Sequence, residues 1–352
     1  MTATVGDLGG SLGRRAATGR TATRLHELVP GVTVSGLVAV AATATGHLVP
    51  VVGGPVLGIV LGLGMGAAIA PGERLRCGLA FVAGPILKVA IVVLGATLSL
   101  SEIATACEGA LPVMLGTLVL VLVGAWAVGR LVGVRGDTAV LIGVGTAICG
   151  ASAIAAASAV LRPTGAQIAY ALGTILTFNV VAVLTFPVLG HVLDMTPRSF
   201  GLWAGTAIND TSSVVAAGYS YSPEAGPHAV VVKLTRSLAL IPIVVVLALV
   251  KARRDAQPLG RALPWRKLVP PFLVGFVAAA GLTTAGVVPA AAAAGLTATG
   301  MFLITASMAA IGLTLKVDDL RAAGPRPLVL GAVLWVCAAA GSLGLQALTG
   351  TF

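Results

Sequence analysis

Four ionisable residues lie in stretches that are otherwise apolar and long enough to cross a bilayer: Lys88, Lys233, Arg236 and Asp210. An ionisable group at the bilayer centre costs at least roughly 2.5–3.5 kcal/mol, so it usually faces a cavity or a partner and marks a functional site. Three cations against one carboxylate leave an excess of positive charge. This excess favours a site for a small anion, which would bind the cations and nearby N–H groups.

These residues also have interpretations without a substrate. Lys233 and Arg236 are three residues apart, on one face of a helix, within two turns of its expected outer end, where snorkelling would bring their charges to the interface. Asp210 would either neutralise a cation or couple to a proton or sodium ion. Asn179 is equally suited to a helix–helix hydrogen bond and to a substrate contact. Lys88 lies near the middle of its span and is harder to explain by snorkelling.

A repeated segment includes Asp210. GTAICGASAIAAA (145–157) aligns without gaps with GTAINDTSSVVAA (205–217), and seven of thirteen positions are identical. Gly in a helix interior costs about 1 kcal/mol relative to Ala, and Ser and Asp compete for backbone hydrogen bonds. We therefore expect each copy to break a helix in the middle of the membrane. Close packing of helices through small residues is the alternative interpretation.

Irregular backbone at this depth is tolerated only where it lines a cavity or is buried in protein. The N-terminal end of a half-helix there attracts an anion. We expect Asp210 and Asn179 to serve a coupling ion. The residues expected to bind the substrate anion are Gly145, Thr146, Cys149, Ser152, Thr206, Asn209, Ser212, Lys88, Lys233 and Arg236.

The elements that position these residues must be transmembrane helices. Hydrophobic residues make up 57% of the chain, charged residues only 10%, and the mean hydropathy is +1.02, whereas soluble domains carry about 25% charged residues. We expect an all-α polytopic transmembrane helical bundle over 28–352, with a mobile cytoplasmic tail over 1–27. Stretches of roughly 20 apolar residues can span the bilayer, and we place eleven, near 31–49, 51–70, 79–101, 110–131, 138–161, 165–191, 199–219, 228–250, 268–288, 292–316 and 327–349.

The net charge of +10 follows from this topology. With a cytoplasmic N-terminus, the inner segments hold all but four of the 22 Lys and Arg residues, and only Arg162 falls on an outer loop. This is the positive-inside pattern, so we expect a multi-pass plasma-membrane protein with its C-terminus outside and no nucleic-acid partner. The four cysteines have no paired spacing and predict neither disulfides nor a zinc site; we expect no cofactor. The small-residue helices would permit a homodimer.

A second internal similarity pairs LGATLSLSEI (94–103) with IGLTLKVDDL (311–320). These copies lie seven spans apart and run in opposite directions, which is the inverted-repeat character of secondary transporters. The two GTAI copies, in contrast, lie two spans apart and run parallel in this topology. Either a span is miscounted or the two halves of the chain are permuted.

The stretch 143–250, together with PGERLRCGLAFVAGPILKVAIVVLGATLSL (71–100), resembles the YeiH-type family of bacterial membrane proteins. The likeness runs from about residue 50 to the C-terminus, and it implies export of sulfate. The same regions are more distantly similar to the sodium/bile-acid symporter and auxin-carrier superfamily. That similarity implies two crossed broken helices in a core domain beside a panel domain, with 145–152 in one of them and the place of the second open. The family's usual His-Asp pair reads Asn209-Asp210 here, which would weaken proton coupling.

These features predict a secondary transporter of a small anion, sulfate or a related sulfur oxyanion, working by alternating access in the lipid bilayer. An anion channel is the alternative, because a pore can use the same cations. An intramembrane enzyme would need a base within reach of Cys149 or Ser152. The four histidines are expected at membrane edges or outside, so we expect no enzyme. A purely structural role would leave the mid-membrane polar groups without a use.

Overall fold

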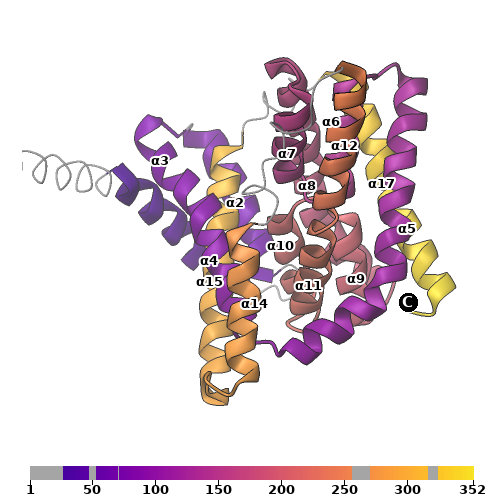
Figure 1. Cartoon of the computed structure of the whole chain (residues 1–352). Coiled ribbons are helices and arrows are strands. Elements are labelled where there is room, and N and C mark those ends of the chain that lie inside the picture. The colour runs from indigo at the N-terminus through magenta and orange to yellow at the C-terminus, as the bar shows by residue number, and fades with distance from the viewer. Residues whose placement is uncertain (1–26, 47–52, 70, 256–269, 316–323) are drawn as a thin grey trace, which may run out of the picture.

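The computed structural model describes residues 27–46, 53–69, 71–255, 270–315 and 324–352, and these residues form helices with no strand among them (Figure 1). Seven of the described helices are long and apolar enough to cross a membrane on their own. The expected all-α polytopic bundle is confirmed. The tail predicted over 1–27 lies outside the described residues except for Glu27.

Two long segments contain a local irregularity. The segment Glu73–Gly95 is one continuous helix in which a π-helical turn, η1, surrounds Pro85, because proline has no N–H to donate to the preceding turn. The segment Ala225–Arg253 is interrupted between α11 and α12. The helices in chain order are Glu27–Gly46, α2 (Gly53–Ile69), α3 (Glu73–Phe81), η1 (Val82–Ile86), α4 (Leu87–Gly95), α5 (Leu100–Val132), α6 (Asp137–Ala147), α7 (Ala151–Leu161), α8 (Gly165–Val192), α9 (Pro197–Ala207), α10 (Thr211–Tyr221), α11 (Ala225–Ser237), α12 (Leu240–Asp255), α14 (Pro271–Thr284), η3 (Ala290–Ala292), α15 (Ala293–Thr314) and α17 (Pro325–Thr349).

Both GTAI segments break a helix, as expected, but after each break the chain does not continue in the same direction. After α6 the chain turns through Ile148–Gly150, and α7 returns beside α6. A Cβ added to Gly145 would lie 3.1 Å from the side chain of Ile154, whereas nine residues of continuous helix would separate the two by about 13 Å. We call α6 and α7 the first hairpin, and α9 and α10, which turn through Ile208–Asp210, the second hairpin.

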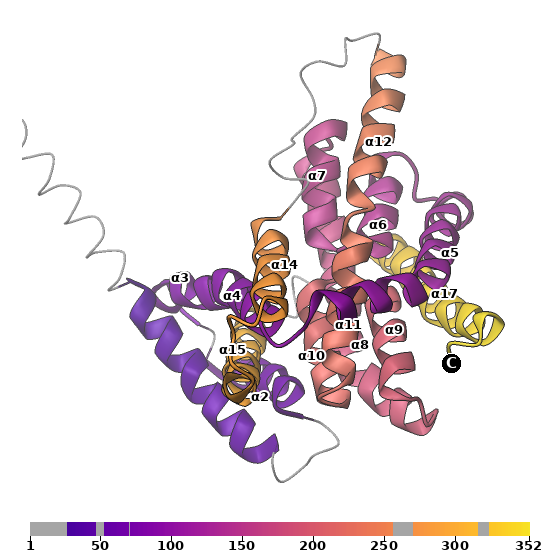
Figure 2. The same ribbon diagram turned by 60° about the horizontal axis from the view of Figure 1, so that its bottom comes forward.

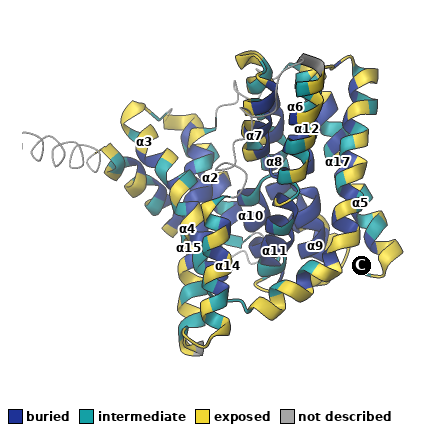
Figure 3. Cartoon of the chain, in the orientation of Figure 1, coloured by how far each residue is buried: buried dark blue, intermediate teal, exposed yellow. Residues whose placement is uncertain are grey.

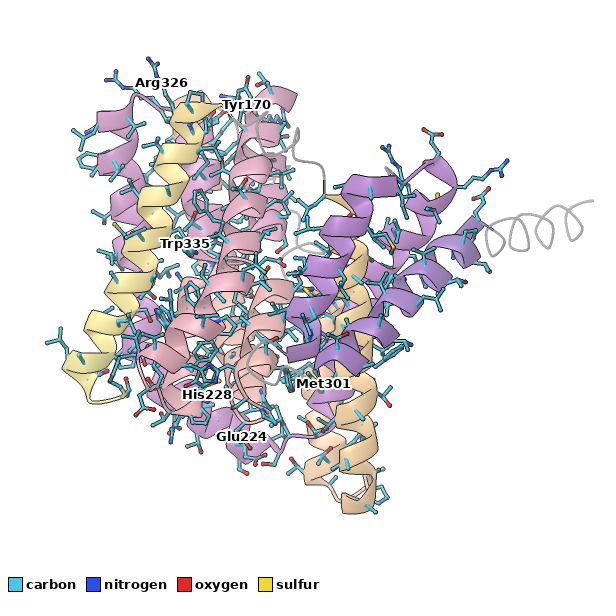
Figure 4. All side chains as sticks on the ribbon, turned by 180° about the vertical axis from the view of Figure 1, so that it is seen from behind. Tyr170, Glu224, His228, Met301, Arg326 and Trp335 are labelled. Carbon is cyan, nitrogen blue, oxygen red and sulfur yellow. The ribbon has the colours of Figure 1, made fainter. Side chains whose placement is uncertain are left out.

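The two hairpins enter from opposite faces and meet at their tips. Figures 1 and 2 show α6 and α7 in the upper half of the molecule and α9 and α10 in the lower half. The long helix α8 joins them, running from the face that carries Tyr170 and Arg326 toward the face that carries Glu224 (Figure 4). At the meeting point, a Cβ added to Gly150 would lie 3.4 Å from the Cβ of Asp210.

This geometry corrects the expected topology. The segments predicted as spans 138–161 and 199–219 are re-entrant hairpins, each of which returns to the face where it entered. The two broken helices also meet tip to tip instead of crossing. Because the hairpins enter from opposite faces, the GTAI copies are inverted relative to each other, so both internal similarities have the inverted sense.

The correction exchanges two arginines between the faces. Arg162, which follows the first hairpin, joins Arg130, Arg135 and Arg326 on one face, while Arg198, at the start of the second hairpin, joins Glu224 on the other. The number of basic residues on each face is unchanged by this exchange. The asymmetry that suggested the topology is therefore retained.

The helices form two groups that lie side by side (Figures 1 and 2). One contains Glu27–Gly46 with α2, α3, α4, α14 and α15; the other contains α5 to α12 and α17. The second hairpin lies at the boundary, where α10 packs on α2 and α15. Buried residues are concentrated around α9, α10 and α11, whereas α3 and the far ends of α14 and α15 are exposed (Figure 3).

The close packing of α2 on α15 gives a first prediction. A Cβ on Gly62 would lie 2.4 Å from the carbonyl oxygen of Ala309, whereas a Cβ on Gly64 of the same helix would have no neighbour within 4 Å. We expect Gly62→Ala to lower stability by about 1–3 kcal/mol, the usual cost of overpacking, and Gly64→Ala to leave it unchanged. Thermal melts of the detergent-purified variants measure this, and equal melts for both would contradict the described packing.

Candidate functional site

The candidate site lies where the two hairpin tips meet beside α11. The first tip is Ile148–Gly150 and the second is Ile208–Asp210. Helix α11 packs on both arms of the second hairpin. Its side chain Lys233 bonds to the second tip, and Arg236 bonds to the residue just before the first tip. A single helix thus carries two cations to the middle of the protein.

Arg236 is bound to the first hairpin. Its side chain is fully buried, and its Nε donates a hydrogen bond of 2.6 Å to the carbonyl oxygen of Ala147, the last residue of α6. A cation at a helix C-terminus also interacts favourably with the helix dipole. The two terminal nitrogens, Nη1 and Nη2, are buried with no hydrogen-bond partner in the described part of the chain. Since buried donors are normally paired, these two nitrogens are free for a ligand.

Lys233 is bound to the second hairpin in the same manner. Its Nζ is fully buried and donates a hydrogen bond of 2.7 Å to the carbonyl oxygen of Ile208, immediately after α9. Within the described ranges, neither Lys233 nor Arg236 has a carboxylate oxygen within 4.0 Å. The snorkelling interpretation is therefore wrong for both residues, because their charges lie inside the protein against the tips.

Asp210 caps the N-terminus of α10, the second helix of its hairpin. Its carboxylate accepts hydrogen bonds from the backbone N–H of Ser212, at 2.9 Å, and from the Ser212 hydroxyl. Its own N–H donates to Oδ1 of Asn179 on α8, at 3.2 Å. A carboxylate at a helix N-terminus is stabilised by the first-turn N–H groups and by the dipole. Asn179 is thus a helix–helix contact that fixes the second tip.

The first tip has a different arrangement. The residue at the N-cap of α7 is Gly150, with φ of +66°, and no side chain caps this helix. The hydroxyl of Ser152 donates to Sγ and to the carbonyl oxygen of Cys149, at 2.9 and 3.1 Å. Ser152 is exposed and Ala151 is half-buried. The start of α7 is therefore not enclosed by the described part of the protein, whereas Lys233 and Arg236 are fully buried.

The remaining predicted residues have varied surroundings. The hydroxyl of Thr146 and Oδ1 of Asn209 are buried without a partner in the described part of the protein. Thr206 Oγ1 lies 2.7 Å from Oγ of Ser342 on α17 and 2.7 Å from the carbonyl oxygen of Leu202, to which it donates, so it joins helices. Gly145 packs against the side chain of Ile154, which would lie 3.1 Å from a Cβ at this position.

Lys88 is not part of this arrangement. It is exposed on α4, whose main packing partners are α14 and α15 in the other group of helices. The expectation that three cations converge is corrected to two. Sequence reasoning also missed Gly150, and the signal was present, because the alignment of the two GTAI copies places it opposite Asp210.

Other features do not coincide with the tips. A cavity of about 620 Å³ lies between α5, α6 and α12, and its lining of Trp126, Arg130, Leu247 and similar residues includes no tip residue. No group of three or more His, Cys, Asp or Glu residues that could hold a metal ion occurs among the residues described.

Two hairpins that enter a helical bundle from opposite faces, with buried cations at their tips, define the class: a multi-pass membrane protein with an inverted re-entrant core. The chain matches the family described as conserved hypothetical protein 698 over residues 30–331. It is 34% identical over 342 residues to a UPF0324 membrane protein of Fusobacterium nucleatum, covering 92% of this chain and 98% of the relative. It is 35% identical over 334 residues to one of Streptococcus mutans, covering 91% and 97%.

The chain therefore belongs to the UPF0324 family of membrane proteins, and the resemblance to the YeiH-type family is confirmed. A relative in Clostridium tetani is 32% identical over 324 residues, covering 86% of this chain and 92% of the relative. The names of these relatives state that they are membrane proteins and specify no substrate.

Proposed function

We propose that the protein is a secondary transporter of a small anion, sulfate or a related sulfur oxyanion, and that it works by alternating access. The observation that carries the proposal is the pair of fully buried cations, Lys233 and Arg236, each hydrogen-bonded to one hairpin at or directly beside its tip. Asp210 is the one carboxylate that the described tips contribute. Two cations and one anion leave a net positive charge, which a bound anion would neutralise.

The closeness of the tips favours a carrier over a channel. The two tips lie so close that a Cβ added to Gly150 would be 3.4 Å from the Cβ of Asp210. An ion therefore crosses only if the group of helices that holds the tips moves. That group is distinct from the one containing α2 and α15, and the two meet along α10. Movement of the hairpin group against the other would expose the tips to each face in turn, which is alternating access around a fixed site.

The proposal assigns a role to each tip residue. Lys233 and Arg236 provide the positive field, and backbone N–H groups of the tips bind the anion. Asp210, held by Asn179, couples transport to a proton or a sodium ion. We assign no chemical step to Cys149, because its thiol is hydrogen-bonded to the hydroxyl of Ser152, and a serine hydroxyl is not a general base. The proposed orientation has the N-terminus in the cytoplasm of the cell and the C-terminus outside, as the positive-inside rule favours.

The test is an anion panel on the detergent-purified protein at constant ionic strength: sulfate, sulfite, thiosulfate, phosphate and chloride. A ligand that binds only the folded state stabilises it by about 2.7 kcal/mol at 100 times its dissociation constant. We expect a selective rise in melting temperature with a sulfur oxyanion, and saturable, ion-coupled uptake of that anion into proteoliposomes. Flux that never saturates and ignores ion gradients would favour the anion channel.

Sulfate also stabilises proteins by exclusion from their surface. The matched control is therefore the rise in melting temperature of the Arg236→Lys variant with the same anion. In this variant the exclusion of sulfate from the surface is unchanged, whereas specific binding is weakened. Equal shifts in both proteins, with no uptake of any oxyanion under an imposed gradient, would overturn the proposed function.

A further inference from the structure

The two hairpin tips differ at one aligned position. In the GTAI repeat, Gly150 of the first hairpin corresponds to Asp210 of the second. The carboxylate of Asp210 occupies the N-terminus of α10, where it accepts the N–H of Ser212. Gly150 provides no such group, and α7 begins without a side-chain cap. One half-helix therefore carries a side-chain anion at its N-terminus, and its counterpart carries none.

A second observation points to a ligand at the uncapped N-terminus of α7. Arg236 bonds through Nε to Ala147, three residues before Gly150, and keeps Nη1 and Nη2 buried and unpartnered within the part of the protein that is described. The two free terminal nitrogens of a buried guanidinium can donate two parallel hydrogen bonds to two oxygens of one anionic group, as they do to a carboxylate. The buried hydroxyl of Thr146, in the last turn of α6, is a further donor without a partner.

We propose that the transported anion binds at the N-terminus of α7, in the place that corresponds to the Asp210 carboxylate on α10. This inference rests on the proposed function and specifies its binding site. The first-turn N–H groups of α7 hold one oxygen, and the terminal nitrogens of Arg236 hold another. The ligand class is then an anion with at least two oxygens on one centre, because one oxygen accepts from the first-turn N–H groups while another pairs with the guanidinium.

The first test fills the place with a side chain. Gly150→Asp supplies the carboxylate from the protein itself, and Gly150→Asn is its matched control, because both side chains meet the same positive φ and the same neighbours at Ile175 and Asp210. With isothermal titration of sulfate, we expect Gly150→Asp to bind at least about a hundredfold more weakly than the wild type, and Gly150→Asn to bind within about tenfold of it. Equal affinities of the two variants would overturn the inference.

The second test needs no substitution and therefore does not depend on the variants folding. Amide hydrogen exchange of the wild type is measured by mass spectrometry with and without sulfate. The first-turn amides of α7 (151–153) should exchange faster than those of α10 (211–213) without sulfate, and sulfate should slow the former at least about tenfold while leaving the latter unchanged. Equal slowing of both turns, or of neither, would contradict the inference.

The two failures are distinguishable. If the wild type binds no oxyanion at all, the proposed function fails and this inference fails with it. The wild type could instead bind sulfate while Gly150→Asp and Gly150→Asn have equal affinities and the exchange of the α7 amides is unchanged. The anion then binds elsewhere, and only the assignment to α7 is overturned.

Discussion

Replacing Arg236 with lysine is expected to weaken oxyanion binding by about ten- to a hundredfold while the protein stays folded. The lysine keeps the buried positive charge and can still reach the carbonyl oxygen of Ala147, but it lacks the planar fork whose Nη1 and Nη2 are free. Loss of a charge-assisted hydrogen bond costs about 1.5–3 kcal/mol, and each 1.4 kcal/mol is about tenfold in affinity. Titration of the purified variant with sulfate measures the change.

The matched control for that experiment is Lys88→Ala. This residue is also a cation within an apolar stretch, but it is exposed and lies on α4, away from the hairpins. We expect it to bind sulfate as the wild type does. A loss of binding in Lys88→Ala with normal binding in Arg236→Lys would place the anion site in the other group of helices.

The Asp210→Asn variant is expected to bind the anion yet lose accumulation against a gradient. Asparagine is as good an N-cap as aspartate, so α10 keeps its start, while the carboxylate available to a coupling ion is gone. In proteoliposomes with an imposed proton or sodium gradient, accumulation should fall from manyfold to an internal concentration about equal to the external one. Anion exchange across the membrane should persist, since the two cations stay in place.

Asp194→Asn provides the same change of charge outside the tips. Asp194 is exposed on the turn after α8 and has φ of +50°, a conformation that asparagine tolerates well. We expect gradient-driven accumulation to be unchanged in this variant. If Asp210→Asn accumulates the anion as the wild type does, coupling does not involve Asp210.

The breaks in the two helices could be predicted from the sequence, because Gly, Ser and Asp in the middle of an apolar stretch weaken a helix wherever it lies. The direction of the chain after each break could not. A half-helix of 11 residues, such as α7, is about 16 Å long, so two of them have the length and hydropathy of one span. The charge pattern gave no help, since exchanging Arg162 for Arg198 leaves the count on each face unaltered.

The candidate site was predictable to a similar extent. Lys233 and Arg236 were recognised because charge within an apolar stretch is costly in any fold. Lys88 satisfied the same criterion, and only the packing of α4 shows which way it faces. The free terminal nitrogens of Arg236 were beyond sequence reasoning as well, because they depend on the bond that Nε makes to a residue 89 positions earlier.

The difference between Gly150 and Asp210 has a consequence for how such a core can arise. In a symmetric homodimer both subunits carry the same residue at corresponding positions, so the two tips would be identical. Both would then be capped by a carboxylate, or both would be open. Joining the inverted copies in one polypeptide removes this constraint, since each copy accumulates its own substitutions. Covalent fusion thus permits one tip to specialise in receiving a ligand and the other in holding a fixed charge beside it.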